Sequence, residues 1–174
     1  MGKASRTKGC AFERLVAKQV IAAAGKGFSR RDCYRTPMSG GHPFAGESDL
    51  VLSEKLMRLF PWCVECKHYK GWKVDGVFKA NKAHQDWCKQ AAHSASKDHF
   101  KRPPMVVMRG NGGNIYCAAR YRDLKAWDHR MSNEALPGLM FSFQDSFWKM
   151  SLFSEVLRAL KSKAKRARLK RQKV

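Results

Sequence analysis

The segments Ser48–Leu52 (SDLVL) and Pro61–Lys67 (PWCVECK) place three charged side chains on two neighbouring apolar runs. Alternate residues of a β-strand share a face, so Glu65 and Lys67 should project together while the residues between them face an apolar core. A turn between the two segments would bring them side by side, antiparallel, with Asp49 next to Glu65. The stretch therefore predicts two carboxylates and an amine at one place in an α/β fold.

This combination of side chains favours phosphodiester chemistry. Mg²⁺ and Mn²⁺ prefer oxygen ligands at roughly 2.0–2.6 Å, which Asp49 and Glu65 can supply. An ammonium group such as that of Lys67 can orient an attacking water or offset charge that develops on a phosphate. The alternative is an edge strand with ordinary surface charges. The upstream acid favours the metal site.

The spacing resembles a known signature. Asp49, fifteen intervening residues and then Glu65-Cys66-Lys67 resemble the PD-(D/E)xK nuclease motif, with Ser48 where that superfamily often has proline. Three further features are similar in order and spacing to archaeal-type Holliday junction resolvases, over about residues 6–120: Lys8–Arg14 opening a helix, Ser39-Gly40-Gly41 before the acid, and Gln85 after the lysine. A viral or phage member of the superfamily fits this resemblance.

The resemblance implies roles for individual residues. Asp49 and Glu65, assisted by Glu13 and the backbone carbonyl of Cys66, would hold Mg²⁺, for which Mn²⁺ would substitute. Lys67 would position the nucleophile, and cleavage would leave a 5′-phosphate and a 3′-hydroxyl. The alternative is that Glu13 has no role at the site and is an acid near the start of a helix, where the helix dipole favours negative charge.

Two further residues acquire roles from the same resemblance. Gln85 would face the lysine and help to orient the water or the phosphate, the alternative being a solvated glutamine. Ser39, in the glycine-rich loop 38–46, would contact the DNA backbone. This loop is either a mobile segment beside the site or an ordinary hairpin connection, and His42 within it is either near the scissile phosphate or simply exposed.

Net charge points to a polyanionic partner. The chain of 174 residues carries 35 Lys and Arg against 14 Asp and Glu, a formal net charge of +21, and it is 44% hydrophobic, enough for a core. It contains no run of eighteen apolar residues and no signal-peptide pattern at its N-terminus, so we expect an intracellular, cytoplasmic DNA-binding protein rather than a membrane protein.

Basic residues and aromatic residues gather in three places: the N-terminal lead-in, the exit of the catalytic strand and the C-terminal tail. The predicted DNA contacts are Arg6, Lys8, Arg30, Arg35, Ser39, His68, Lys70, Lys73, Lys165, Arg166 and Arg168. Trp72 would either stack on a base or pack on the edge of the core. The tail would be a DNA-gripping arm that partly orders on binding, or alternatively a targeting run such as a nuclear address.

The cysteines suggest reduced, buried thiols rather than a disulfide framework, because the six are scattered and lie mostly in apolar segments. Cys63 and Cys66 form a C-x-x-C pair, and His84 and Cys88 could lie one helical turn apart. In an extended strand, however, positions 63 and 66 face opposite ways, so we expect no zinc site.

Apolar periodicity predicts an α/β fold of the restriction-endonuclease type: a mixed sheet of about five strands flanked by helices, with a basic helical appendage. Residues 1–125 would form the nuclease core, and residues 126–174 an extension ending in a basic tail over about 158–174. The expected elements are helices over 10–24, 80–97 and from Asp145 onward, and strands around Arg30, Asp49, Val64, Val106 and Ile115.

These features together predict a Mg²⁺-dependent, structure-selective endodeoxyribonuclease that cleaves branched DNA. By resemblance it would be a Holliday junction resolvase in DNA recombination and repair, acting as a homodimer on four-way junctions. One alternative is a related nuclease acting on nicked, forked or packaging-intermediate DNA. Another, from a different class, is a non-catalytic basic nucleic-acid-binding protein.

Overall fold

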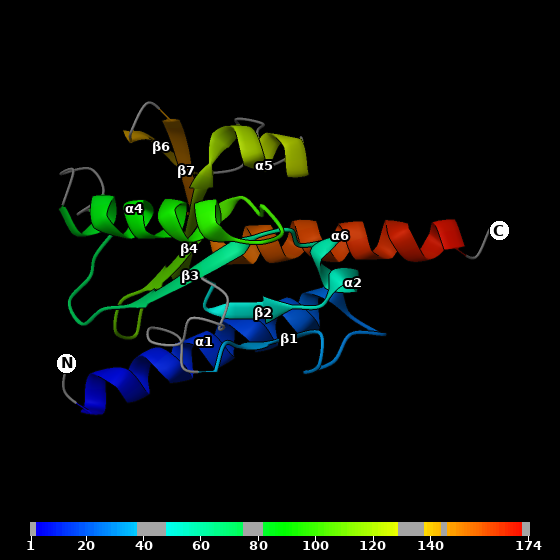
Figure 1. Ribbon diagram of the computed structural model, residues 1–174, viewed down its shortest axis with the longest axis horizontal. Helices are drawn as coiled ribbons and strands as arrows, with labels where there is room; N and C mark the ends of the chain where they lie inside the picture. Colours follow the sequence, from blue (N-terminus) through cyan, green and yellow to red (C-terminus); the bar gives the residue numbers. More distant parts are fainter. Residues whose placement is uncertain (1–2, 38–47, 75–81, 129–137, 144–145, 172–174) are drawn as a thin grey trace.

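A five-stranded sheet and a separate two-stranded sheet carry the fold (Figure 1). The computed structural model describes residues 3–37, 48–74, 82–128, 138–143 and 146–171. In chain order the elements are α1 (Lys3–Ala24), β1 (Cys33–Arg35), β2 (Leu50–Leu52), α2 (Glu54–Met57), β3 (Cys63–His68), α4 (Lys82–Lys97), β4 (Pro104–Arg109), β5 (Ile115–Arg120), α5 (Tyr121–Trp127), β6 (Gly138–Phe143), β7 (Ser146–Leu152) and α6 (Phe153–Arg171).

The larger sheet is mixed and has the strand order β3-β4-β5-β7-β6. Strands β3 and β4 are parallel and are joined through α4, whereas the pairs β4–β5, β5–β7 and β7–β6 are antiparallel. This confirms the predicted α/β class with a mixed central sheet flanked by helices, consistent with a restriction-endonuclease-like fold. Strand β3 lies at one edge of this sheet, which leaves one side of its backbone free for other partners.

Two segments that were predicted as strands of the main sheet do not belong to it. The segments around Arg30 and Asp49 were expected in the main sheet, but they form the separate antiparallel pair β1–β2. The turn expected after Leu52 is the short helix α2, whose N-terminus is capped by the Ser53 side chain, which accepts a hydrogen bond from the Leu56 N–H. Strands β6 and β7, which were not predicted, are the fourth and fifth members of the main sheet.

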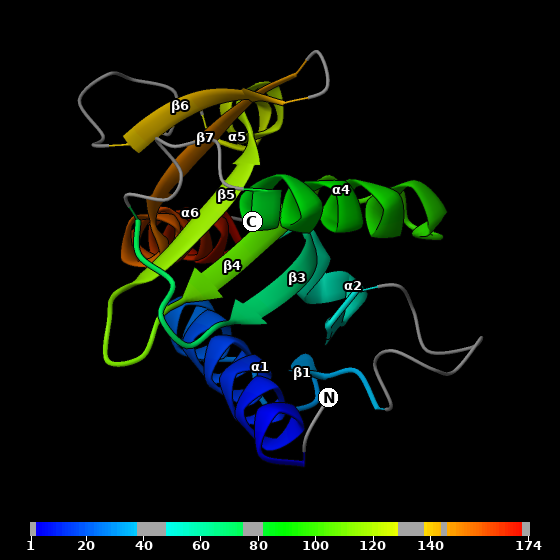
Figure 2. The same ribbon diagram turned by 90° about the vertical axis from the view of Figure 1, so that its left-hand side faces the viewer.

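Each face of the main sheet has its own core. Alternation along β4 turns Met105 and Val107 toward α1 and α6, and Val106 and Met108 toward α4. Figure 2 shows α4 on one side of β3 and β4, with α1 and α6 on the other. A strand that is buried on both faces reads as a continuous apolar run, as β4 does.

Helix α1 begins at Lys3 rather than at Cys10, so the basic lead-in is the first turns of the helix and not a flexible segment. Residues 3–8 contain no proline, and most of them have good helix propensity. As expected, the helix ends before Gly25. The φ of Gly25 is 77°, a left-handed conformation that favours glycine.

The C-terminal third differs most from the expectation. A helix from Asp145 is wrong for residues 146–152, which form β7, and Asp145 itself lies outside the described residues. Helix α6 begins at Phe153, and its apolar stripe packs in the same core as α1, with Val156 and Leu160 fully buried. In the described part of the chain, residues 138–171 thus share a sheet and a core with the N-terminal part.

The basic tail is helical as far as Arg171, in agreement with the predicted basic helical appendage, and its partial ordering on DNA binding stays a prediction. The guanidinium of Arg168 donates to the backbone carbonyl of Ala24 at 2.9 Å, where it satisfies a free carbonyl at the end of α1. No helix in the described residues is both long and apolar enough to cross a membrane.

Candidate active site

Strand β3 turns Glu65 and Lys67 toward the α4 side of the sheet, as its alternation predicts. Glu65 lies opposite Val106, which belongs to the α4-side core, whereas Val64 belongs to the core beneath α1. The ammonium of Lys67 lies 2.7 Å from Oε1 of Glu65. An acid and an amine therefore meet at the edge of the sheet, next to the open side of β3.

Asp49 reaches this edge from the residues just before β2. Its backbone N–H donates to the carbonyl of Val64 at 2.8 Å, and its Oδ2 accepts from the backbone N–H of Cys66 at 2.7 Å. The expected antiparallel pairing of β2 with β3 is wrong, because β2 pairs with β1. Asp49 nevertheless arrives beside Glu65, held by hydrogen bonds to β3 on both its backbone and its side chain.

Ser48 is the positioning residue of this turn. Its buried hydroxyl donates to the carbonyl of Val64 at 3.1 Å and accepts from the N–H groups of Val64 at 2.9 Å and of Leu50 at 3.3 Å. A hydroxyl has one donor and two acceptor sites, so all are used. Thr36 completes the turn by donating to the Ser48 carbonyl at 2.6 Å. Sequence reasoning missed this role; the available signal was a hydroxyl residue directly preceding the acid in an apolar run.

Glu13 approaches from α1, with 8% of its surface exposed. Its Oε2 lies 2.5 Å from Nε of Arg35, on β1. The charge of Glu13 raises the pKa of both Asp49 and the Cys66 thiol, which places this third acid within electrostatic reach of the other two. Arg35, predicted to contact DNA, is paired with Glu13 in this structure, and its contact with DNA stays a prediction.

Electrostatics single out Asp49. Burial, and then the negative charges of Glu65 and Glu13, raise its pKa from 3.8 to about 7, against the opposing effects of the Cys66 N–H and Lys67. Negative charge is therefore poorly compensated at this point of the protein. A bound cation would relieve that cost.

The donor set suits a hard divalent cation. Among the described residues, no group of three or more His, Cys, Asp or Glu side chains is arranged to hold a metal by itself. Mg²⁺, however, keeps several waters and is commonly bound through only one or two carboxylates together with substrate phosphates. The two carboxylates Asp49 and Glu65, which share an under-compensated negative charge, fit that mode of binding.

Gln90, rather than Gln85, faces the lysine. Lys67 donates to Oε1 of Gln90 at 2.7 Å, whereas Gln85 is exposed in the first turn of α4. Five residues along an α-helix correspond to about 500° of rotation, so the two glutamines point in clearly different directions. The predicted placement of Gln85 against Lys67 is therefore wrong, and Gln90 is the glutamine that contacts the lysine.

The thiols lie in apolar surroundings. Cys63 and Cys88 are buried, and burial raises the pKa of each to about 12. All six cysteines lie in the described residues, and each is a free thiol. Burial also raises the pKa of the Cys66 thiol well above its usual value, so the part of Cys66 next to the acids that can act as a ligand is its peptide group.

The predicted DNA contacts fall into distinct groups. Several of them are exposed: Lys8, Arg30, Lys70, Lys73, Lys165, Arg166 and Arg168. Some exposed ones also have partners in the protein, since Lys8 donates to Asn111 at 3.3 Å and Arg166 lies 3.6 Å from Asp128. The side chain of Arg6 is not described, and Ser39 and His42 lie outside the described residues.

Two aromatic side chains near the exit of β3 are packed into the protein. His68 lies against Phe12 of α1, with ring centroids 5.5 Å apart, and its pKa is lowered by burial and by the charges of Lys8 and Arg109. Trp72 donates to Nε2 of His84 at 2.5 Å and packs against the α4-side core. Of the two alternatives for Trp72, packing on the core edge is the one observed.

The comparison with protein families decides the class. A family model described as "Phage putative PDDEXK endonuclease" matches residues 4–170. The chain belongs to this family. The match confirms the PD-(D/E)xK superfamily and the phage relationship, and it makes the chain a nuclease-class hydrolase. PDDEXK nucleases usually use divalent metal ions. No curated protein and no solved structure matches this PDDEXK endonuclease significantly.

Replacing Ser48 should destabilise the PDDEXK endonuclease. Ser48→Ala leaves the buried N–H of Val64 without its hydroxyl partner, which should lower the free energy of unfolding by about 1–3 kcal/mol. Urea denaturation measures the difference. Ser142→Ala, at an exposed serine of β6, is the control and should change stability by less than about 0.5 kcal/mol. Equal losses in the two variants would contradict the role of Ser48.

Asp49→Asn should stabilise the metal-free protein at high pH. With a folded pKa of about 7 against 3.8, the folded protein binds more protons than the unfolded chain between these values, so wild-type stability falls as pH rises through that window. Asparagine does not ionise and keeps an oxygen for the Cys66 N–H. The stability difference between variant and wild type should therefore grow from pH 4 to pH 8, by up to about 4 kcal/mol.

Chemical denaturation of dialysed, metal-free protein measures this difference at each pH. Asp86→Asn, at an exposed acid on α4, is the control and should give a difference that is nearly independent of pH. A difference for Asp49→Asn that stays flat from pH 4 to pH 8 would show that Asp49 is not destabilised by burial and by its acidic neighbours.

Proposed function

We propose that this protein is a divalent-metal-dependent endodeoxyribonuclease that cuts branched DNA, with four-way (Holliday) junctions as its main substrate, in DNA recombination and repair. The observation that carries the proposal is the meeting of Asp49, Glu65 and Lys67 at the edge of β3 in a chain of an endonuclease family. Mg²⁺ is the proposed ion, and Mn²⁺ would substitute for it.

Asp49 and Glu65 would hold the ion, with the backbone carbonyl of Cys66 as a further oxygen and Glu13 assisting from α1. The ion supplies Lewis-acid polarisation of the scissile phosphate and activation of a water molecule at neutral pH. The hydrogen bond from the Cys66 N–H to Asp49 leaves the other carboxylate oxygen of Asp49 available to face the ion. Arg35 sets the orientation of Glu13 through their ion pair.

Lys67 would offset the charge that builds up on the phosphate during attack. Its ammonium lies between the Glu65 carboxylate and the Gln90 amide oxygen, each at 2.7 Å, and these two acceptors limit its freedom. A positioned cation of this kind stabilises a transition state without reorganising during the reaction. Gln90 thereby takes the supporting role that resemblance assigned to Gln85.

The strongly basic composition supports DNA as the partner, because the net charge of +21 exceeds what solubility requires. Exposed cations near both ends of the chain and at the exit of β3 would hold backbone phosphates without reading sequence. The proposed contacts are Arg6, Lys8, Arg30, Lys70, Lys73, Lys165 and Arg166, together with Ser39.

A homodimer would match the approximate two-fold symmetry of a four-way junction, with each copy cutting one strand. The apolar face of α6 gives no support for it, since Val156 and Leu160 pack inside the chain. The outer strands give some support for a dimer, since Met140 of β6 and Phe147 of β7 are apolar side chains that are 44% and 67% exposed. We propose this edge of the sheet as the contact between copies.

Removal of either metal-binding acid should separate cleavage from binding. Asp49→Ala and Glu65→Ala should each slow nicking in Mg²⁺ by about 10²- to 10⁴-fold. Both should still shift DNA in a gel with Ca²⁺, because the basic surface is unchanged. Asp86→Ala, at an exposed acid on α4, should cut at the wild-type rate. Wild-type cleavage by Asp49→Ala or Glu65→Ala would refute the metal assignment.

A cleavage panel tests the substrate. Labelled duplex, nicked, forked, flap and four-way DNA are compared in Mg²⁺, and light scattering with and without junction DNA gives the mass of the complex. We expect preferential cutting of the junction by a dimer. Preference for nicked or forked DNA would favour the alternative of a fork-processing or packaging nuclease. Binding with no cleavage of any substrate would favour a non-catalytic DNA-binding protein.

A further inference from the structure

A second feature of the surface lies across α4 from the proposed catalytic pair. A cleft of about 620 Å³ is bordered by Ala92 and Ser96 of α4, whereas Gln90 of the same helix contacts Lys67. Residues 90 and 92 are about 200° apart around a helix, so they lie on opposite flanks of it. The cleft is therefore a site distinct from the one that holds Asp49 and Glu65.

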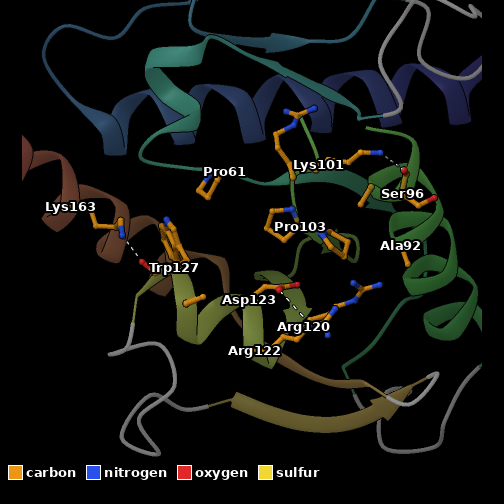
Figure 3. Close-up of a pocket in the computed structure, with 14 residues that line it drawn as sticks. Pro61, Ala92, Ser96, Lys101, Pro103, Arg120, Arg122, Asp123, Trp127 and Lys163 are labelled. Carbon is orange, nitrogen blue, oxygen red and sulfur yellow. Dashed lines mark hydrogen bonds and ion pairs between the residues drawn. The ribbon is translucent and has the colours of Figure 1, made fainter. Parts of the chain in front are cut away.

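The cleft is strongly cationic. Its lining contains one acidic side chain, Asp123, and five basic ones: Lys101, Arg102, Arg120, Arg122 and Lys163. Figure 3 shows Arg120 and Arg122 on the α5 side, Lys101 toward Ser96, and Lys163 beside Trp127. Cations from three separate segments of the chain thus converge on one opening.

Two of these cations are held at the wall of the cleft by close structural partners. Arg102 is buried and forms hydrogen bonds of 2.5–3.1 Å to the carboxylate of Asp98. Lys163 donates to the backbone carbonyl of Trp127 and lies 5.4 Å from the centroid of that ring. Both side chains are fixed in place at the wall of the cleft, and the charge of Arg102 is balanced there by Asp98.

The other three cations are placed to receive a ligand. Nε of Arg120 is buried and has no hydrogen-bond partner among the described residues. The side chain of Arg122 is 74% exposed and only 3.7 Å from Asp123, a loose ion pair. Lys101 is exposed at the rim, where its ammonium makes a long hydrogen bond of 3.4 Å to the backbone carbonyl of Ser96. Arg120 and Arg122 both line the cleft, so an anion that enters it would meet two guanidinium groups.

The chemistry of the lining favours a sugar-phosphate chain. Guanidinium groups match the geometry of phosphate oxygens, and two of them lie together here. Between the cations the lining is apolar, with Pro61, Pro103 and Trp127 forming part of the wall. Such surfaces pack against deoxyribose while the cations hold the phosphates on either side.

We propose that this cleft binds backbone phosphates of a DNA segment other than the one being cut. The inference rests on the proposed function and deepens it. Pro61 at the cleft and Glu65 at the site are at most about 14 Å apart along the chain, so one molecule of DNA can reach both. Helix α4, about 10–12 Å across, separates them, so a branched substrate can place one arm on each flank.

The test compares two charge-matched double variants. Lys101→Gln/Arg122→Gln removes two exposed cations of the cleft. Lys97→Gln/Lys125→Gln removes two exposed cations that flank the cleft, on α4 and α5, without lining it. Affinity for a labelled four-way junction and for a linear duplex is measured in Ca²⁺ over a range of salt concentrations, and thermal unfolding verifies that both variants fold.

For the cleft variant we expect the log-log salt slope of junction binding to fall by about 1–2, since each lost phosphate contact accounts for roughly 0.9 on duplex DNA. The slope for the linear duplex should change less, and the control variant should change neither slope to that extent. Equal slopes for wild type and cleft variant would overturn the proposal. Equal losses on junction and duplex would overturn the assignment to a second segment.

A free phosphate compound is the other source of the same ligand chemistry. If pyrophosphate raises the melting temperature of the wild type but not of the cleft variant, while both bind DNA with the same slope, the cleft does not hold DNA and the proposal fails. These readouts need no cleavage, so they are independent of the nuclease assignment. A wild type that cuts nothing in Mg²⁺ but shows the slope change would refute the nuclease and keep the cleft.

Discussion

The unpaired edge of β3 is the constraint on which the site depends. Backbone groups on an edge strand need partners, and here the hydroxyl of Ser48 and the N–H and carboxylate of Asp49 take the groups of Val64 and Cys66. The same hydrogen bonds that complete the strand therefore bring the first acid to the second. A regular β-ladder at this edge would have used these backbone groups and left the Cys66 N–H unavailable to the Asp49 carboxylate.

Short-range features of the site could be predicted from sequence, and long-range ones could not. Glu65 and Lys67 share a face because alternation is a property of the strand alone. The glutamine was assigned to position 85 rather than 90, because the rotation of α4 about its own axis depends on how it packs on the sheet. Strands β6 and β7 were missed for a related reason: residues 138–153 carry apolar side chains in both phases of the alternation, and only pairing with β5 selects the strand.

The distribution of charge explains why the number of Lys and Arg residues is not the number available to contact DNA. Several cations have structural roles: Arg35 balances Glu13, Arg102 is held by Asp98, and Arg168 caps α1. The chain has only 14 Asp and Glu residues. Those that are buried beside an arginine hold that arginine in place within the protein. The remaining, unpaired cations are the ones through which long-range attraction to a polyanion acts.

The contact between Arg168 and Ala24 joins residues 144 positions apart, and it fastens the last helix onto the first. During synthesis, the apolar stripe of α1 lacks part of its cover until α6 has been made, because Val16 and Val20 share their core with Val156 and Leu160 as well as with the sheet. The helix that carries Glu13 is therefore fully packed only after α6 has emerged and folded against it.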